Sequence, residues 1–400
     1  MHINTITAFQ FQKYTARLSI GKSAVLIIII IALSVVACRD NIENISDRRS
    51  GNGNIVHARG FDIHEFENYR VLEVYNPWQG ARDVLFNYIL LQQGQELPAI
   101  IPEGKVIRTP VRSVICLSTT HVALLDFIDE TGVITGISGS EFIYNPELRE
   151  KIDSKELPDI GYDMNLDYER ILTLDPDIIL AYGVGAEAGA WLDRLRSLGM
   201  NVIMVGEYLE SSPLAQTEWV KFIGHLFNKQ DIVNEKFTKT ESDYIELKRL
   251  ASDVGNRPVV MSGLPWRENW FVPGGRSHFA TLIDHAGGEY LWSGNTRREN
   301  FPVNIETVIE KGSAADFWIN TGTATKKSEI ESSDKRLVTL RPFHTDRVYN
   351  NNARLNRYGG NDYWESGIVN PQLILSDMIH ILHPELLPDH KPVYYKKLGD

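Results

Sequence analysis

Short apolar segments alternate with helical segments along most of this chain, and this alternation limits the folds that the chain can adopt. Val111–Leu117 is an apolar run, and a Ser-Thr-Thr cluster suited to capping a helix separates it from a helical segment over His121–Asp129. Further short apolar runs follow at Val133–Ile137, Asp177–Tyr182 and Asn201–Val205. Strands of this kind are typical of parallel sheets that helices cover on both faces. The first half of the chain therefore predicts an α/β lobe.

A long helical stretch interrupts this alternation, which then begins again. The helical pattern over Ile232–Asp253 ends before a Gly-Asn-Arg-Pro sequence that cannot continue it. The second half then predicts two strands, at Pro258–Ser262 and Asp316–Asn320. It also predicts three helices: one that Ser277 caps and Gly287-Gly288 ends, one over Pro302–Lys311 and one over Gly367–Leu382. We therefore expect an α/β fold with two lobes. Each lobe has a central, mainly parallel sheet flanked by helices, and one long connector helix joins the two.

The amino-terminal segment has the pattern of an export signal. Three basic residues and no acidic residue precede the apolar run Ala24–Ala37, whose last residues are small. Its roughly 14 residues fall short of the ~20 that a membrane-spanning helix needs. An uncleaved membrane anchor is the alternative to a cleaved signal. In both cases the rest of the chain works outside the cytoplasm, attached to a membrane.

The end of this segment, Val35-Val36-Ala37-Cys38, resembles the lipobox of bacterial lipoproteins. The resemblance implies that residues 1–37 are removed and that Cys38 carries the lipid anchor. Their removal takes away three of the 41 Lys and Arg residues and none of the 52 Asp and Glu residues, which leaves a formal charge of −14. A body this acidic is poorly suited to binding nucleic acid. We expect no nucleic-acid partner.

The expected divisions of the chain follow from these patterns. The polar segment Arg39–Gly60 has little apolar periodicity and predicts a flexible tether. Residues 66–108 contain short β-like runs, which we expect to decorate the first lobe. The divisions are a lipoprotein signal peptide over residues 1–37, a tether over 38–63, an N-terminal α/β lobe over 64–229, the connector helix over 230–254 and a C-terminal α/β lobe over 255–400.

The segment Tyr168–Leu180, YERILTLDPDIIL, resembles a signature of class III substrate-binding proteins. These proteins serve ABC importers for iron-siderophore complexes, heme and vitamin B12. The similarity runs over roughly residues 110–385 and includes the PGGRSHF sequence that begins at Pro273. It implies a ligand held in a cleft between two lobes and an ABC permease as partner. It also implies that each lobe presents one glutamate to permease arginines, and by motif these are Glu169 and Glu306.

Loops that follow the predicted strands of the second half combine aromatic and basic residues. In open α/β sheets, ligands bind at the carboxyl ends of the strands. Arginine binds carboxylates and phosphates, and aromatic faces pack against flat surfaces. The predicted ligand-binding residues are Trp266, Arg267, Arg276, Arg354, Tyr363 and Trp364. They favour a large anion with planar or apolar portions: a ferric siderophore or heme, or cobalamin through its aromatic face and phosphate.

Other functional classes have weaker support in the sequence. The GISGS sequence over residues 136–140 lacks the final glycine of a nucleophile elbow, and no P-loop is present. His121 and His278 are isolated, and no carboxylate–histidine cluster has metal-site spacing. We therefore expect a binding protein of the periplasm or cell envelope, with no catalytic residue, cofactor or resident metal. A secreted, lipid-anchored hydrolase and a ligand-sensing module without an importer are the alternatives.

Overall fold

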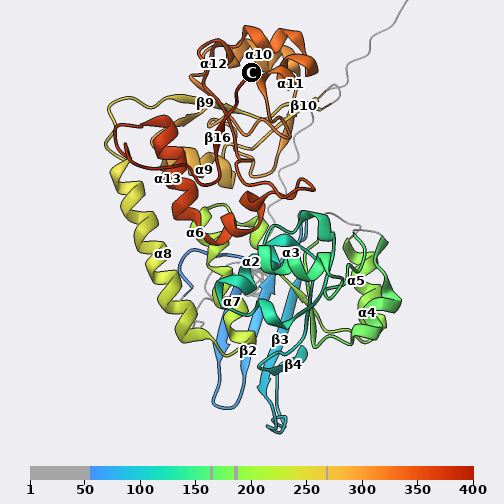
Figure 1. Ribbon diagram of the computed structural model, residues 1–400. Helices are drawn as coiled ribbons and strands as arrows, with labels where there is room; N and C mark the ends of the chain where they lie inside the picture. Colours follow the sequence, from blue (N-terminus) through green and yellow to red (C-terminus); the bar gives the residue numbers. More distant parts are fainter. Residues whose placement is uncertain (1–54, 163–164, 184–187, 267–268) are drawn as a thin grey trace, which may run out of the picture. The chain divides into compact units, whose positions relative to one another are not determined.

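The computed structural model describes residues 55–162, 165–183, 188–266 and 269–400 (Figure 1). The signal segment and Cys38 lie outside the described residues. A four-stranded parallel sheet forms the centre of the first lobe. Its strands, in spatial order, are β6 (Ile134–Ile137), β5 (Val114–Cys116), β7 (Ile178–Ala181) and β8 (Val202–Met204). Every residue of β5, β7 and β8 is buried, as expected for strands covered on both faces.

Helices connect these strands and lead out of the sheet. In chain order they are α2 (Thr119–Phe127), α3 (Pro146–Asp153), α4 (Tyr168–Leu174), α5 (Ala188–Ser197), α6 (Pro213–Thr217) and α7 (Trp219–Leu226). Ser118 begins α2, because its hydroxyl accepts the amide of Thr120. The crossover helices keep the strands parallel, so that the loops at the carboxyl ends of the strands share one edge of the sheet.

A second, four-stranded sheet precedes this lobe in the chain. Its strands lie in chain order: β1 (Phe61–Glu65), β2 (Arg70–Tyr75), β3 (Leu85–Gln92) and β4 (Lys105–Thr109). The backbone leading into β1 is bound to the lobe, whereas the sequence places it in a tether that ends at residue 63. Buried Glu218 accepts the amides of Val56, His57 and Ala58, and Glu210 accepts those of the next two residues. Two acidic side chains that are distant in sequence thus hold this segment in place. The composition of the segment itself gives no sign of these contacts.

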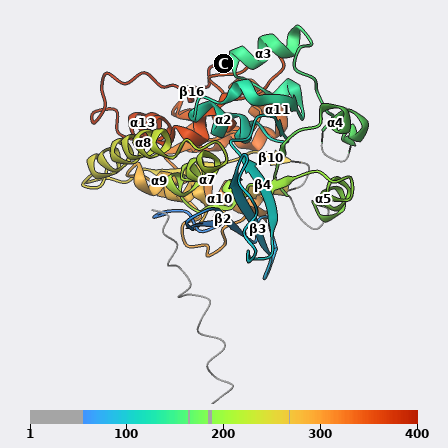
Figure 2. The ribbon, with the colours of Figure 1, turned by 90° about the horizontal axis from the view of Figure 1, so that it is seen from below.

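One long helix, α8 (Gln230–Leu250), leads from the first lobe to the second (Figure 1). Its buried residues include Val233 near its start and Tyr244 near its end. Val233 belongs to the hydrophobic core of the first lobe and Tyr244 to that of the second. The C-terminal helix α13 (Pro371–Leu382) packs beside α8, and the two also lie side by side in Figure 2. The connector is therefore fixed to both lobes by packing.

The second lobe contains a five-stranded sheet and a small three-stranded one. The larger sheet has the order β12 (Glu289–Tyr290), β9 (Val259–Ser262), β14 (Phe317–Ile319), β15 (Val348–Asn350) and β16 (Lys396–Lys397), with only β16 antiparallel to its neighbour. The smaller one is antiparallel and has the order β10 (Pro265–Trp266), β11 (Asn269–Val272) and β13 (Phe301–Val303). The helices, besides α13, are α9 (His278–His285), α10 (Ile305–Gly312), α11 (Lys327–Ser333) and α12 (Arg341–His344).

Each lobe has its own hydrophobic core. Trp219 and Phe222 of α7 are fully buried in the first core, and Trp270 and Trp318 stack in the second with ring centroids 5.7 Å apart. Separate cores, each around a mainly parallel sheet, define two lobes. The expected α/β fold of two lobes joined by one long helix is confirmed.

Two predicted helices in the second lobe begin later than expected. The sequence places one over Pro302–Lys311, but residues 301–303 form β13, and α10 begins after them because Asn304 accepts the amide of Thr307. The other was expected over Gly367–Leu382. Its first residues form the short 3₁₀ helix η7 (Ser366–Val369), and α13 begins at Pro371, which has no amide hydrogen to donate.

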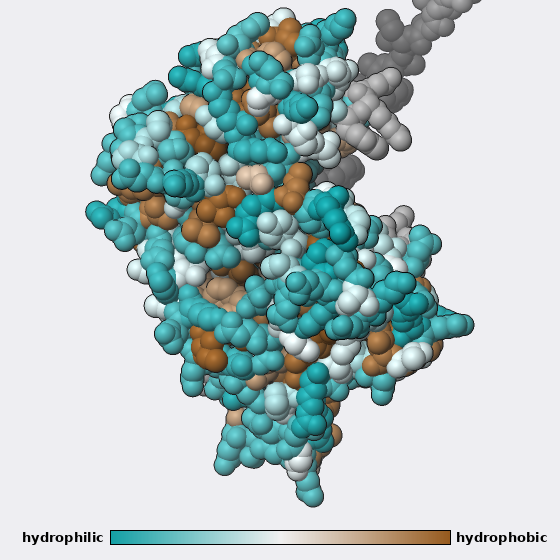
Figure 3. All heavy atoms as spheres, in the orientation of Figure 1, coloured by the Kyte–Doolittle hydropathy of each residue, from teal (hydrophilic) through white to brown (hydrophobic). Residues whose placement is uncertain are grey.

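The face of the protein in Figure 3 is mostly hydrophilic, and hydrophobic residues are exposed on it in small groups. Among the described residues, no helix is long and apolar enough to cross a membrane.

Candidate ligand site

A pocket of about 580 Å³ is bounded by residues of both lobes. Ser211, which follows β8 of the first lobe, contributes to one wall. The remaining lining residues come from the second lobe: from α9, from β12, from the loops on either side of them, and from Arg257, which precedes β9. The hydroxyl of Thr281 on α9 donates to the carbonyl oxygen of Ser211 at 3.0 Å, so the two lobes touch at the edge of this pocket.

Two glycines shape the loop that carries Arg276 into this pocket. A Cβ atom on Gly274 would lie 2.2 Å from the carbonyl oxygen of Arg297, and one on Gly275 would lie 2.3 Å from that of Asn295. Only glycine permits this close backbone approach. The amide of Arg276 then donates to the carbonyl oxygen of Arg297 at 2.9 Å. The PGGRSHF sequence thus joins two backbone segments next to the pocket.

Arg276 lies directly before the start of α9. The next residue, Ser277, begins the helix, because its hydroxyl accepts the amide of Ala280 at 3.2 Å. A helix N-terminus carries partial positive charge and favours anions. The guanidinium of Arg276 and the first turn of α9 therefore both make this end of the pocket positive.

The arginines of the pocket differ in whether a carboxylate neutralises them. Arg257 pairs with Asp284 at 2.6 Å. Arg276 and Arg298 are exposed, and neither forms an ion pair with any residue in the described part of the chain. Two guanidinium groups are therefore available to an incoming anion, and each offers several donors in a fixed planar arrangement.

Of the six predicted ligand-binding residues, the structure places only Arg276 in this pocket. Arg267 lies outside the described residues, and Trp266 ends β10. The other three belong to the segment that follows β15. Arg298 is not among the residues that the sequence predicts to bind ligand. The signal that could have selected it is the Arg297-Arg298 pair in the loop after β12.

The three predicted residues that follow β15 have other contacts. Arg354 pairs with buried Asp362 at 2.7 Å. The ring of Tyr363 is buried against Tyr394 and Tyr395, and this burial raises the pKa of Tyr363 to about 12. The side chain of Trp364 is exposed. These residues belong to a contact between the lobes rather than to the pocket that holds Arg276.

Buried titratable groups follow two strands of the first lobe's sheet, and burial disfavours their charged forms. His121 follows β5 and is fully buried, and this burial lowers the pKa of His121 to about 3. Glu207 follows β8, and its burial raises the pKa of Glu207 to about 7. Burial likewise lowers the pKa of His278, on α9, to about 4. No three His, Cys, Asp or Glu side chains in the described part of the chain gather as metal ligands.

The two glutamates expected to meet a permease occupy equivalent positions. Glu169 is the second residue of α4, which leads into β7, and Glu306 is the second residue of α10, which leads into β14. Both helices begin at a capping side chain, Asp167 for α4 and Asn304 for α10. Both glutamates are exposed. The two lobes thus repeat the same local arrangement, as the sequence predicts.

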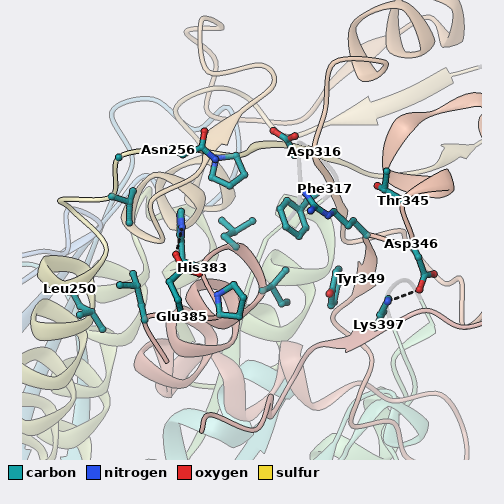
Figure 4. Close-up of a pocket in the computed structure, with 18 of the residues that line it drawn as sticks. Leu250, Asn256, Asp316, Phe317, Thr345, Asp346, Tyr349, His383, Glu385 and Lys397 are labelled. Atoms are coloured by element: carbon teal, nitrogen blue, oxygen red, sulfur yellow. Dashed lines mark ion pairs between the residues drawn. The ribbon is translucent and has the colours of Figure 1, made fainter. Parts of the chain in front are cut away.

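A larger hollow of about 750 Å³ lies at the amino ends of β9, β14 and β15 (Figure 4). Its charged residues are largely paired: Lys397 points toward Asp346 at 2.5 Å, and Asp316 pairs with Arg341 at 3.0 Å. The pocket that holds Arg276 instead has two exposed arginines that form no ion pair with a described residue. It is therefore the better candidate for a site that binds an anion.

Comparisons with known proteins agree with this architecture. Residues 114–338 match the periplasmic binding protein family. An uncharacterised lipoprotein of Methanocaldococcus jannaschii is 24% identical over 354 residues, which cover 84% of this chain and 83% of the relative. The petrobactin-binding protein YclQ of Bacillus subtilis is 22% identical over 233 residues, which cover 57% of this chain and 68% of the relative.

A solved structure of a periplasmic heme binding protein from Pseudomonas aeruginosa has the same fold. It aligns with a TM-score of 0.54 at 14% identity, over 72% of this chain and 99% of that chain. The matching family and the similar folds are those of substrate-binding proteins rather than enzymes. The family match spans more than half of the sequence and includes the parallel sheet of the first lobe and β9, β12 and β14 of the second. This chain belongs to the periplasmic binding protein family.

Proposed function

We propose that this protein is the extracytoplasmic, lipid-anchored substrate-binding component of an ABC importer. In this proposal it captures an anionic iron chelate or a related ligand between its two lobes and delivers it to a permease. The observation that carries the proposal is the pocket bounded by both lobes, in which Arg276 and Arg298 form no close ion pair with a described residue. In a protein with a net charge of −11, two exposed arginines on one pocket favour an anionic ligand.

Ferric siderophores are the first ligands to test. A relative named for binding petrobactin supports this class, and a structure of the same fold named for binding heme supports the alternative. Cobalamin is the third member of the panel, because its phosphate could bind the same arginines. The volume of the pocket, about 580 Å³, lies within the usual range for small-molecule sites.

Native mass spectrometry of the full chain against ferric siderophores, heme and cobalamin tests the proposal. We expect one ligand to bind with a stoichiometry of one and to be recovered with unchanged mass. Recovery of a cleaved ligand would instead identify a hydrolase. Binding without any transport in cells would identify a ligand-sensing module. If no member of the panel binds, the proposed ligand class is wrong.

The anchor has a separate test. The Val-Val-Ala-Cys sequence and the lipoprotein names of two relatives support acylation of Cys38 after removal of residues 1–37. The variant Cys38→Ser should then leave the membrane fraction or accumulate as an uncleaved precursor. The matched control is Cys116→Ser, because Cys116 is buried in the first lobe and should have no part in anchoring. An intact mass that shows an unmodified Cys38 would contradict the proposal.

A further inference from the structure

Residues 353–369, which follow β15 of the second lobe, make several polar contacts with the first lobe. We call this segment the clasp. It contains two short 3₁₀ helices, η6 (Asp362–Trp364) and η7 (Ser366–Val369). Ile368 and Val369 at its end are buried within the hydrophobic core of the first lobe, although β15 and α13 on either side of the clasp belong to the second. The clasp therefore links the lobes at a place distant in sequence from α8.

Glu365 makes a two-fold polar contact between the clasp and the first lobe. Its two carboxylate oxygens accept the amides of Tyr144 and Asn145, each at 2.7 Å. Asn145 in turn begins α3, because its side chain accepts the amide of Leu148. The side chain of Glu365 is buried, and no ion pair joins it to a cation among the described residues. Separation of the lobes would therefore break both of these hydrogen bonds.

Asn356 makes a second polar contact of this kind. Its amide nitrogen donates to the carbonyl oxygens of Glu141 and Ile143, at 2.8 and 2.7 Å. Its side-chain oxygen accepts the amides of Tyr358 and Gly360 within the clasp, each at 2.8 Å. One side chain thus shapes the clasp and attaches it to the first lobe. A Cβ atom at Gly360 would lie 2.4 Å from the carbonyl oxygen of Phe142, so only glycine allows the approach.

Further contacts surround these two residues. Arg357 pairs with Asp153 at the end of α3, at 2.8 Å. The hydroxyl of Thr119 donates to the carbonyl oxygen of Trp364 at 3.1 Å, and that of Thr217 donates to the carbonyl oxygen of Ile368 at 2.7 Å. The clasp therefore contacts η2 (Ser140–Phe142), α2, α3 and α6, which are four elements of the first lobe.

We propose that the clasp is a second, noncovalent connection that holds the two lobes at a fixed separation, and that Glu365 and Asn356 lock it. The clasp adds contacts from a further segment of the chain to α8 and to the bond between Thr281 and Ser211, and these contacts restrict bending of the lobes about α8. The pocket between the lobes then keeps its shape without ligand. This inference goes beyond the proposed function and does not depend on which ligand binds.

Hydrogen exchange measured by mass spectrometry on the full chain tests the proposal. In the double variant Glu365→Gln, Asn356→Ala, the amides of Tyr144 and Asn145 should exchange roughly tenfold faster or more. The hydrogen bonds of Glu365 and Asn356 to the first lobe are weakened or lost in this variant, so local opening costs less free energy. Exchange in α8 should not change. The control is Glu329→Gln: Glu329 also accepts a backbone amide, that of Thr325 at 2.7 Å, but within the second lobe. This control variant should leave exchange at Tyr144 and Asn145 unchanged.

Unchanged exchange at Tyr144 and Asn145 in the double variant would overturn the proposal, and so would an equal rise in the Glu329→Gln control. If the double variant does not fold, Arg357→Ala serves instead, because its ion pair with Asp153 is exposed and the variant should fold. It should raise exchange only in the peptide that ends α3. Scanning calorimetry provides a second measurement: one cooperative transition is expected for the natural chain and two for a chain without the lock. Two transitions in the natural chain would contradict the inference.

Discussion

The two lobes have similar sheets but present different chemistry to the region between them. At the carboxyl edge of the first lobe, His121 and Glu207 are buried, with the pKa of the histidine lowered by burial to about 3 and that of the glutamate raised by burial to about 7. The second lobe instead presents Arg276 and Arg298, both exposed. The exposed cations that line the pocket therefore come from the second lobe, whereas the first lobe contributes Ser211 to the lining.

The same contrast holds for the two glutamates that begin α4 and α10. Glu306 pairs with Arg336 at 3.0 Å, whereas Glu169 forms no ion pair with a described residue. Hydrogen bonding at the start of α10 and to Arg336 lowers the pKa of Glu306, which therefore stays ionised. A permease arginine would find Glu169 available but would compete with Arg336 for Glu306. We therefore expect Glu169 to contribute more to docking than Glu306, although the two residues occupy equivalent positions.

The largest expected effect is on transport. Reversal of both charges, Glu169→Lys with Glu306→Lys, should abolish uptake, because loss of a partner from a close interfacial charge pair costs about 2–5 kcal/mol and repulsion adds to it. Of the single variants, Glu169→Lys should be the more damaging. Uptake of labelled ligand by cells and ligand affinity of the purified protein are the two measurements. Affinity should not change.

The control for this experiment is Glu310→Lys, an exposed charge reversal in the later part of α10. It should transport normally. Undiminished uptake by the double variant would rule out the two glutamates as docking residues. A larger loss from Glu306→Lys than from Glu169→Lys would show that the ion pair with Arg336 opens on docking.

The second effect concerns ligand affinity. Loss of a charge-assisted hydrogen bond costs about 1.5–3 kcal/mol, so Arg276→Ala and Arg298→Ala should each raise the dissociation constant roughly ten- to hundredfold. Arg297→Ala is the matched control, because Arg297 is adjacent in sequence but does not line the pocket. Calorimetric titration with the ligand found by mass spectrometry provides the measurement. Wild-type affinity in both pocket variants would place the site elsewhere.

The sequence predicts the buried parts of this fold better than the exposed ones. The apolar runs locate the parallel strands well: the run at Asp177–Tyr182, for example, contains β7. Burial on both faces requires continuous apolar residues, so the signal is local. The small antiparallel sheet was missed because β10, β11 and β13 are two to four residues long. In β13, a proline also resembles the first residue of a helix.

The candidate site was predicted only in part for a related reason. The Gly-Gly pair before Arg276 is a local signal for close backbone approach, and the structure shows that approach. Nothing local distinguishes Arg276 from Arg354, since both follow strands of the second lobe. The difference is a partner: Arg354 pairs with Asp362, which a turn of the clasp brings back to it. Pairing of this kind depends on tertiary structure.

The third effect is a pH dependence of stability that the clasp controls. Burial raises the pKa of Glu365 from 4.5 to about 8, and nearby Asp362 and Asp126 add to the rise, while the amides of Tyr144 and Asn145 oppose it. A raised pKa means that the native state binds more protons than the unfolded state. The free energy of unfolding should therefore fall as the pH rises toward 8, by at most about 1.4 kcal/mol per pH unit for this group.

The useful window lies above about pH 6.5, because buried histidines such as His225, whose pKa is lowered by burial to about 4, act in the opposite direction at lower pH. Glu207 and Glu210, whose pKa values burial raises to about 7, contribute to the same decline. Urea unfolding across this window measures the slope. The variant Glu365→Gln should reduce it, and Glu329→Gln should not. An unchanged slope in Glu365→Gln would show that Glu365 stays ionised throughout.

The smallest expected effect is that of Arg354 on ligand affinity, in contrast to Arg276 and Arg298 of the pocket. Arg354→Ala should change the dissociation constant of the ligand by less than about threefold, within the range of a surface substitution. The guanidinium of Arg354 already has a buried partner, Asp362 at 2.7 Å, and it lies over the ring of Tyr144 with 5.2 Å to the centroid. Stability should fall more than affinity, because the variant leaves the carboxylate of Asp362 buried without its cation. Titration and urea unfolding of the same sample measure both quantities. A tenfold loss of affinity with unchanged stability would show that Arg354 reaches the ligand, and that the clasp forms part of the binding site.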